Sequence, residues 1–213
     1  MNNIIGIFEN LYQRNITILP KTFYLQDTFN IAEDLLGKLI VHYEGHNTTA
    51  GRIVEVEIYI GKCDKASHAY RFGKTKRTMV MFERGGLAYV FNVHKYNQFC
   101  VVTGEKDHPD AILIRAIEPV YGVEIMKNRR KTENLIKLGS GPGILCQSLN
   151  ITKKLYGIDL ASPNSELFIC DDYFIFKKDE IIKTKRIGIN YAQEYIHVPW
   201  RYYLKNSPFV SVL

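Results

Sequence analysis

Two acids and a tyrosine alternate along an apolar run in the first third of the chain. Residues 52–68 read RIVEVEIYIGKCDKASH. Successive side chains of a strand point to opposite faces, so this run predicts that Glu55, Glu57 and Tyr59 share one face. A strand face that met bulk water would more often carry lysine, threonine or serine. The segment therefore predicts a polar pocket wall, and His68 follows shortly after the strand.

An arginine lies in a second apolar run, where its charge needs a partner. Arg115 sits inside AILIRAI, which is apolar on both faces and typical of a central, buried strand. An unpaired buried charge is strongly destabilising, and a guanidinium is almost never deprotonated. Glu57 is the natural partner, either in an ordinary internal ion pair or in an acid and base pair that holds a water molecule. In both cases the guanidinium favours the ionised carboxylate, which accepts a proton from water but cannot donate one.

Other motifs with recognisable chemistry are weak or missing. The four cysteines are scattered, without a C-x-x-C pair or a His/Cys cluster, which predicts free thiols and no metal site. The GSGPG turn at 139–143 opens a helix, and it favours a plain capping turn over a phosphate site. Neither a P-loop nor a dinucleotide-binding motif is present. His68 alone, and the aromatic residues of 89–96, are more typical of ordinary packing than of a site.

The composition fits one globular domain that spans residues 1–213, with 46% hydrophobic residues to form a core. No apolar run reaches the length of a membrane span, and the first residues lack the basic start of a signal peptide. We therefore expect a cytoplasmic protein without a membrane partner. The net charge of +6 and basic clusters such as 71–77 and 127–131 are compatible with nucleic acid, although each cluster alone is typical of a solvated face.

The elements that must position these side chains are mostly strands joined by turns. Strands are predicted at 38–43, 49–60, 87–93, 99–103 and 111–117, and helices at 31–36, 120–131 and 144–149. Residues 66–77 are expected to be irregular, and Pro119 is expected to end its strand. Because the strands come as hairpins rather than as βαβ units, we predict an α+β fold: a single domain with a curved, mainly antiparallel sheet and peripheral helices.

Together, these segments resemble the alkyladenine (3-methyladenine) DNA glycosylase family of the mammalian type. The resemblance runs from about residue 35 to 213 and rests on LLGKLIV, GRIVEVEIYIG, ASH, GGLAYVF, AILIRAIEP, SGPGILCQSLNI, DLAS, RIGINYAQEY and SPFVS. It implies a monofunctional enzyme of base-excision repair that flips an alkylated purine out of the duplex and hydrolyses its N-glycosidic bond, leaving an abasic site. It also implies a monomer that binds double-stranded DNA with damaged purines and uses no metal or cofactor.

Carried over by motif, the resemblance assigns a water nucleophile to Glu57 in VEIYIG, Arg115 in LIRAIEP and the backbone carbonyl of Ile187 in RIGI. It assigns the base pocket to three ring-bearing side chains: Tyr59, His68 and Phe91. The expected substrates are purines of the 3-methyladenine and 7-methylguanine class.

The chain departs from the family pattern at three places. Phe91 stands where a tyrosine is common, which keeps stacking but removes a hydroxyl. The side chain that fills the gap left by the flipped base is either His94 or Tyr96, and counting from Phe91 favours His94. Val102 stands near the place of an asparagine associated with exclusion of guanine, so Val102 is the expected selectivity position.

Two alternatives from other classes remain open. A catalytically silent nucleic-acid-binding module on the same scaffold would bind DNA without releasing a base, although the retention of Glu57 and Arg115 argues against it. A structural or interaction domain with an internal ion pair would bind duplex DNA negligibly, whereas a glycosylase would bind it with a strong salt dependence.

Overall fold

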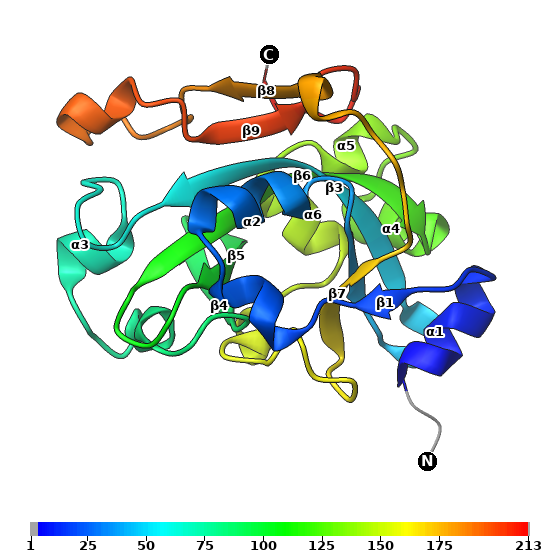
Figure 1. Cartoon of the computed structure of the whole chain (residues 1–213). Helices are drawn as coiled ribbons and strands as arrows, with labels where there is room; N and C mark the ends of the chain where they lie inside the picture. Colours follow the sequence, from blue (N-terminus) through cyan, green and yellow to red (C-terminus); the bar gives the residue numbers. More distant parts are fainter. Residues whose placement is uncertain (1–3, 213) are drawn as a thin grey trace.

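An antiparallel sheet curls around the core in the computed structural model, which describes residues 4–212 (Figure 1). Its nine strands are β1 (Thr17–Ile18), β2 (Leu39–His42), β3 (Thr49–Tyr59), β4 (Ala88–Val93), β5 (Tyr96–Thr103), β6 (Asp110–Tyr121), β7 (Leu167–Asp171), β8 (Ile181–Thr184) and β9 (Arg201–Leu204). The main path runs β1-β7-β2-β3-β6-β5-β4, and β9 joins it by pairing with β3 and β8. The prediction of a single α+β domain with a curved antiparallel sheet is confirmed.

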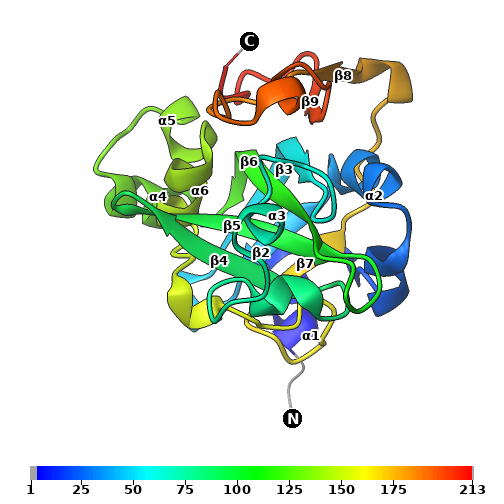
Figure 2. The ribbon, with the colours of Figure 1, turned by 90° about the vertical axis from the view of Figure 1, so that its left-hand side faces the viewer.

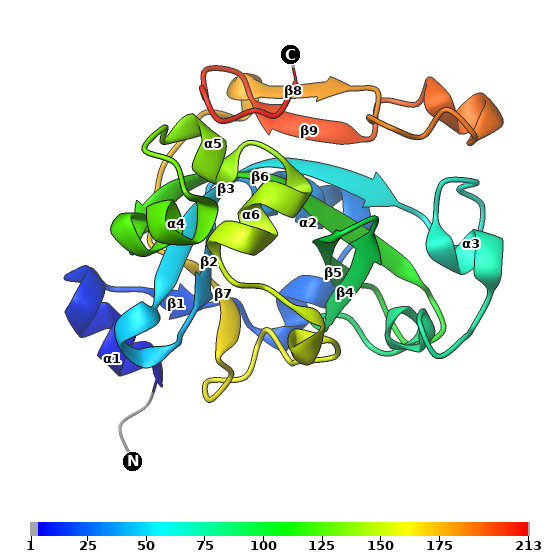
Figure 3. The ribbon, with the colours of Figure 1, turned by 180° about the vertical axis from the view of Figure 1, so that it is seen from behind.

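Short helices surround this sheet. The α-helices in the described part of the chain are α1 (Ile4–Tyr12), α2 (Thr28–Leu35), α3 (His68–Phe72), α4 (Val123–Arg130), α5 (Ile136–Gly139) and α6 (Pro142–Ser148). Helices α4, α5 and α6 pack together, and α6 lies against β5 and β6 (Figure 3). Helix α3 lies beyond the end of β3 (Figure 1). Within residues 4–212, none of the helices has the length and apolar character that a membrane crossing requires.

The long strand β3 is the strand on which the candidate site depends. Its first half pairs with β2, its second half pairs with β9, and β6 pairs with it along most of its length. Its register with β6 shifts between Ile53 and Glu55, so Ile53 and Val54 both enter the main apolar core while Glu55 and Glu57 leave it. The β8–β9 hairpin lies above β3 and β6 in Figure 2, and β9 pairs with β3 at Glu55, Val56 and Glu57.

The predicted elements differ from the structure mainly at their ends. Pro119 does not end its strand, because β6 continues to Tyr121 and Pro119 faces Gly51 at a register shift, where a missing N–H is tolerated. The helix predicted at 120–131 begins later, after Gly122 in a left-handed conformation with φ 70°. Residues 66–77 are not wholly irregular, since they contain α3.

Candidate active site

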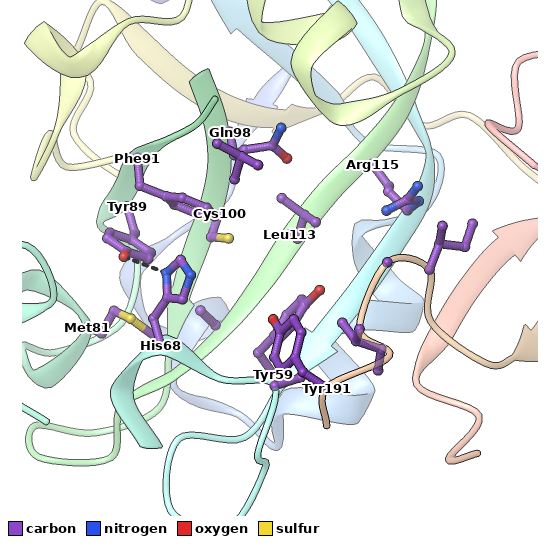
Figure 4. Close-up of a pocket in the computed structure, with 16 residues that line it drawn as sticks. Tyr59, His68, Met81, Tyr89, Phe91, Gln98, Cys100, Leu113, Arg115 and Tyr191 are labelled. Carbon is purple, nitrogen blue, oxygen red and sulfur yellow. Dashed lines mark hydrogen bonds between the residues drawn. The ribbon is translucent and has the colours of Figure 1, made fainter. Parts of the chain in front are cut away.

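A cavity of about 430 Å³ opens between the end of β3, the β4–β5 hairpin, α3 and residues 187–191 (Figure 4). Its wall is mainly aromatic and apolar, with one arginine. The side chains that line it include Tyr59, His68, Tyr89, Phe91, Cys100, Leu113, Arg115 and Tyr191. A volume in this range is typical of ligand sites, which are mostly apolar with a few placed polar groups.

Glu57 is completely buried just behind this wall. Its Oε1 lies 3.4 Å from Nη1 of Arg115 and accepts the backbone N–H of Ile187 at 2.8 Å. Its Oε2 accepts the hydroxyl of Tyr59 at 2.8 Å. The structure therefore brings Glu57 and Arg115 together as the sequence predicts, and each of the three partners of Glu57 lines the cavity.

Burial raises the pKa of Glu57 above its ordinary value, even though Arg115, the Ile187 amide and the Tyr59 hydroxyl each lower it. Arg115 thus favours the ionised carboxylate, as the sequence predicts, but desolvation outweighs its effect on the pKa of Glu57. A carboxylate whose pKa is raised is a stronger base once ionised, so it accepts a proton from water more readily.

Arg115 reaches Glu57 because β6 bulges at this point. Glu55 pairs with Ala116 and Val56 with Ile114, so Arg115 is the extra residue between two pairings. Bulges of this kind redirect a side chain and are common beside active sites. Arg115 also contacts a second acid, since its Nε donates to Oε1 of Glu55 at 3.2 Å. Sequence reasoning did not assign this second acid to Arg115, although Glu55 stands two residues before Glu57 on the same strand.

His68, Tyr89 and Phe91 form one side of the cavity (Figure 4). Nδ1 of His68 lies 2.9 Å from the hydroxyl of Tyr89. The rings of His68 and Phe91 meet edge-on, with their centroids 4.6 Å apart. Burial, with the charges of Arg77 and Arg71, lowers the pKa of His68 to about 4, so the ring is neutral at neutral pH. The sequence alone favours a packing role for Tyr89, because alternation in a strand looks the same whether a face packs in the core or lines a cavity.

Tyr59 and Tyr191 also line the cavity, and Figure 4 shows both across from His68 and Phe91. The guanidinium of Arg186 lies 4.7 Å from the ring centroid of Tyr59, and it is held by Asp64 in a fully buried ion pair. Arg186 and Asp64 thus support Tyr59 from behind. Tyr191 is half-exposed and carries Arg71 over its ring at 4.3 Å.

The two candidates for the inserted side chain differ in freedom. His94 is exposed at the tip of the β4–β5 hairpin, in a left-handed conformation with φ 51°. Tyr96 is half-buried and packs on Gly143 so closely that a Cβ on that glycine would lie 2.8 Å from the Cβ of Tyr96. Val93, which directly precedes His94, lines the cavity, so the tip of the β4–β5 hairpin stands at the mouth of the cavity.

Val102 is placed away from the cavity. It is fully buried in an apolar cluster with Ala111 and Phe91, and it is not among the residues that line the cavity. Cys100, two residues earlier on the same face of β5, does line it. Cys100 is therefore the residue of this strand face that reaches the cavity, and the assignment of selectivity to Val102 stays a prediction. Burial raises the pKa of the Cys100 thiol, which keeps it protonated.

Within residues 4–212, no three His, Cys, Asp or Glu side chains gather where they would hold a metal ion. The polar side-chain groups around the cavity include one carboxylate, one guanidinium, a neutral imidazole, hydroxyls and the amide of Gln98. This set can hold and deprotonate a water molecule beside a flat aromatic ligand.

Known proteins are similar to this chain over most of its length. The family model described as "Methylpurine-DNA glycosylase (MPG)" matches residues 22–208. Three proteins named "Putative 3-methyladenine DNA glycosylase" are similar to the chain over 91% of its length and 98% of their own. The protein of Clostridium novyi (strain NT) is 43% identical over 202 residues, that of Alkaliphilus oremlandii (strain OhILAs) 45% over 203, and that of Methanoculleus marisnigri (strain ATCC 35101 / DSM 1498 / JR1) 44% over 194.

Proposed function

Because the chain belongs to the methylpurine-DNA glycosylase family and is a DNA-3-methyladenine glycosylase of DNA repair, we propose a specific course for its reaction. The enzyme acts as a monomer on double-stranded DNA and flips out purines of the 3-methyladenine and 7-methylguanine class. Glu57 activates a water molecule that hydrolyses the N-glycosidic bond and leaves an abasic site. The observation that carries the proposal is a fully buried carboxylate whose partners line an aromatic cavity.

The cavity suits an extruded, positively charged base. Unstacking a nucleotide costs a few kcal/mol, and stacking on aromatic walls returns about 1–3 kcal/mol per base. Alkylation at N3 or N7 makes the purine cationic, and a cation over an aromatic face gains about 0.5–2 kcal/mol more. His68 is neutral at neutral pH, so it lines the cavity without repelling this charge. Tyr59 and Phe91 supply the stacking faces on the two sides.

Hydrolysis then needs only a water and a base. The C1′–N9 bond breaks with its electron pair going to the alkylated purine, which leaves as a neutral molecule. The sugar becomes oxocarbenium-like, and ionised Glu57 stabilises that charge because it is desolvated and fixed. The water oxygen bonds to C1′ while its proton passes to Glu57. We assign Arg115 and the backbone carbonyl of Ile187 to orienting the water, since both residues contact Glu57 and line the cavity.

We assign the inserted side chain to His94 rather than Tyr96. An inserted residue must leave the protein surface and enter the minor groove, as in other proteins that distort DNA. His94 is exposed at the hairpin tip, whereas Tyr96 is occupied by its packing on Gly143. We likewise assign purine selectivity to Cys100, because it reaches the cavity and Val102 does not.

A panel of duplexes, each with one lesion, tests the proposed function. We expect release of 3-methyladenine and 7-methylguanine by the full chain under single-turnover conditions, and the panel also gives the response to the neutral lesions hypoxanthine and ethenoadenine. Salt-dependent binding without release of any base would favour the silent module. The absence of salt-dependent binding would favour a structural domain. Sedimentation with and without DNA tests the monomer.

A further inference from the structure

A second buried carboxylate stands behind the catalytic one and has no part in the reaction described above. Glu55 is fully buried and does not line the cavity. Its Oε1 accepts from Nε of Arg115 at 3.2 Å and from Nη1 of Arg201 at 2.8 Å. Its Oε2 accepts the backbone N–H of Ser211 at 2.7 Å. Glu55 therefore links Arg115 to the last strand and to the C-terminal segment.

The hydroxyl of Ser211 closes this network. It donates to Oε1 of Glu55 at 3.0 Å and accepts from Nε of Arg115 at 3.1 Å. The segment that carries Ser211 is fixed on both sides, because the carbonyl of Val212 accepts from Arg201 at 2.7 Å and the carbonyl of Val210 accepts from Ser140 at 3.4 Å. Ser211 thus contacts the guanidinium on the side away from Glu57.

We propose that Ser211 is a positioning residue for base release: together with Glu55 it holds Nε of Arg115, so that Nη1 of Arg115 stays directed at Glu57. This inference rests on the proposed role of Glu57. Ser211 touches neither the cavity nor the reacting atoms, and it acts only through Arg115.

The contact distances support an external anchor for Arg115. Its Nη1 lies 3.4 Å from Oε1 of Glu57, which is longer than a well-formed hydrogen bond. That contact alone therefore holds the guanidinium weakly. A guanidinium is planar, so two partners at Nε fix the direction of its other nitrogens. Two acids and two arginines also balance in charge, which lowers the cost of burying all four: Glu55, Glu57, Arg115 and Arg201.

The test is Ser211→Ala in the full chain, which removes the hydroxyl and keeps the backbone N–H that donates to Glu55. We expect the single-turnover rate constant for release of 3-methyladenine to fall about tenfold, as for a small displacement of a positioned group. Affinity for duplex DNA with an abasic analogue should stay within about twofold of wild type. Because Arg115 lowers the pKa of Glu57, the acid limb of the rate should also move to higher pH.

Two further variants separate positioning from folding. Ser211→Thr keeps a hydroxyl and should restore the rate and the acid limb. Ser207→Ala is the matched control, because Ser207 is half-buried in the same C-terminal segment but contacts neither Glu55 nor Arg115. It should leave the rate and the pH profile unchanged.

The outcomes are distinguishable. A Ser211→Ala protein with the wild-type rate and acid limb overturns the inference. So does a rate loss that accompanies a lower Tm but leaves the acid limb in place, because a purely structural role would give that result. If Ser211→Ala does not fold, Ser211→Thr decides by its pH profile. Failure of the wild-type chain to release any base would instead contradict the proposed function.

Discussion

The two ends of strand β3 each bury an arginine–carboxylate pair, and the two pairs are built differently. Near its start, Arg52 meets Asp172 through two bonds, of 2.8 and 2.9 Å, and also donates to the carbonyl of Gly37 at 2.8 Å. Near its end, Glu57 meets Arg115 through one contact of 3.4 Å. The first pair is enclosed by packing, whereas Arg115 lines a cavity.

The acids of the two pairs titrate in opposite directions. Burial raises the pKa of Asp172, but the hydrogen bonds and charge of Arg52 and the Tyr12 hydroxyl lower it more, so it lies below its ordinary value. Burial raises the pKa of Glu57 more than Arg115 and its other partners lower it. A fully satisfied carboxylate is a poor base, and a desolvated one with looser pairing is a better base. Burial of an ion pair therefore does not by itself distinguish the two acids; the pairing geometry and the adjoining cavity make Glu57 the candidate base.

Among the substitutions that test this comparison, Glu57→Gln is expected to cause the largest loss of base release. The amide keeps the shape and cannot accept the proton of water, so base release should fall by about 10²–10⁴-fold, the usual contribution of a general base. Binding to duplex DNA with an abasic analogue should persist. Single-turnover release of 3-methyladenine and fluorescence anisotropy measure the two quantities. A variant within a few-fold of wild type in release would remove Glu57 from its proposed role.

The matching change at the other end is Asp172→Asn, which should act on stability instead. It leaves the buried Arg52 without its bidentate acid, so we expect the free energy of unfolding to fall by about 3–5 kcal/mol. Thermal or urea unfolding measures this loss. Below the melting transition, base release per folded molecule should equal that of wild type. A selective loss of release in this variant would mean that the two pairs are not functionally distinct.

The opposite pKa directions predict a pH interval in which the protein is folded and inactive. In the proposed mechanism release needs ionised Glu57, so the acid limb of the rate should lie above about 4.3, the ordinary pKa of glutamate. Asp172 has a lowered pKa in the folded state, so its stabilising effect is present above the unfolded value of about 3.9 and is lost as pH falls through the folded pKa. Rate constants and unfolding curves measured over the same pH series check both limbs. Coincident loss of rate and fold would contradict the separation.

The sequence predicts the chemical partners of the site better than their register. Glu57 and Arg115 are recognisable because each is a charge inside an apolar strand, and a buried charge demands a partner. The contact between Arg115 and a second acid, Glu55, is not recognisable from the sequence, because it depends on bulges in β3 and β6 that no periodicity reveals. The Arg52–Asp172 pair joins residues 120 positions apart, and nothing near Arg52 in the sequence indicates that partner.

Local alternation along β5 is ambiguous in the same way. Val102 and Cys100 stand on one face of β5, and only the depth of the cavity decides which of them a base would meet. Sequence spacing identifies a face but not the depth along it. The fold class is predictable from the sequence, because strands joined by short turns leave few arrangements other than an antiparallel sheet.

The smallest expected effects come from removing one hydroxyl at each end of β3. Tyr59→Phe takes away the O–H that donates to Glu57, and Tyr12→Phe takes away the O–H that donates to Asp172 at 3.0 Å. Because the Tyr59 hydroxyl lowers the pKa of Glu57, its loss should move the acid limb of release to higher pH and reduce the rate near that limb by about tenfold, the effect of losing about 1.5 kcal/mol.

Tyr12→Phe should instead lower the free energy of unfolding by about 1–2 kcal/mol and leave the acid limb in place. Rate–pH profiles and urea unfolding of both variants complete the comparison. Equal shifts of the acid limb in the two variants would show that the limb reports general destabilisation rather than Glu57. A shift confined to Tyr59→Phe ties the limb to one carboxylate, because each hydroxyl contacts a buried acid and only Glu57 has partners that line the cavity.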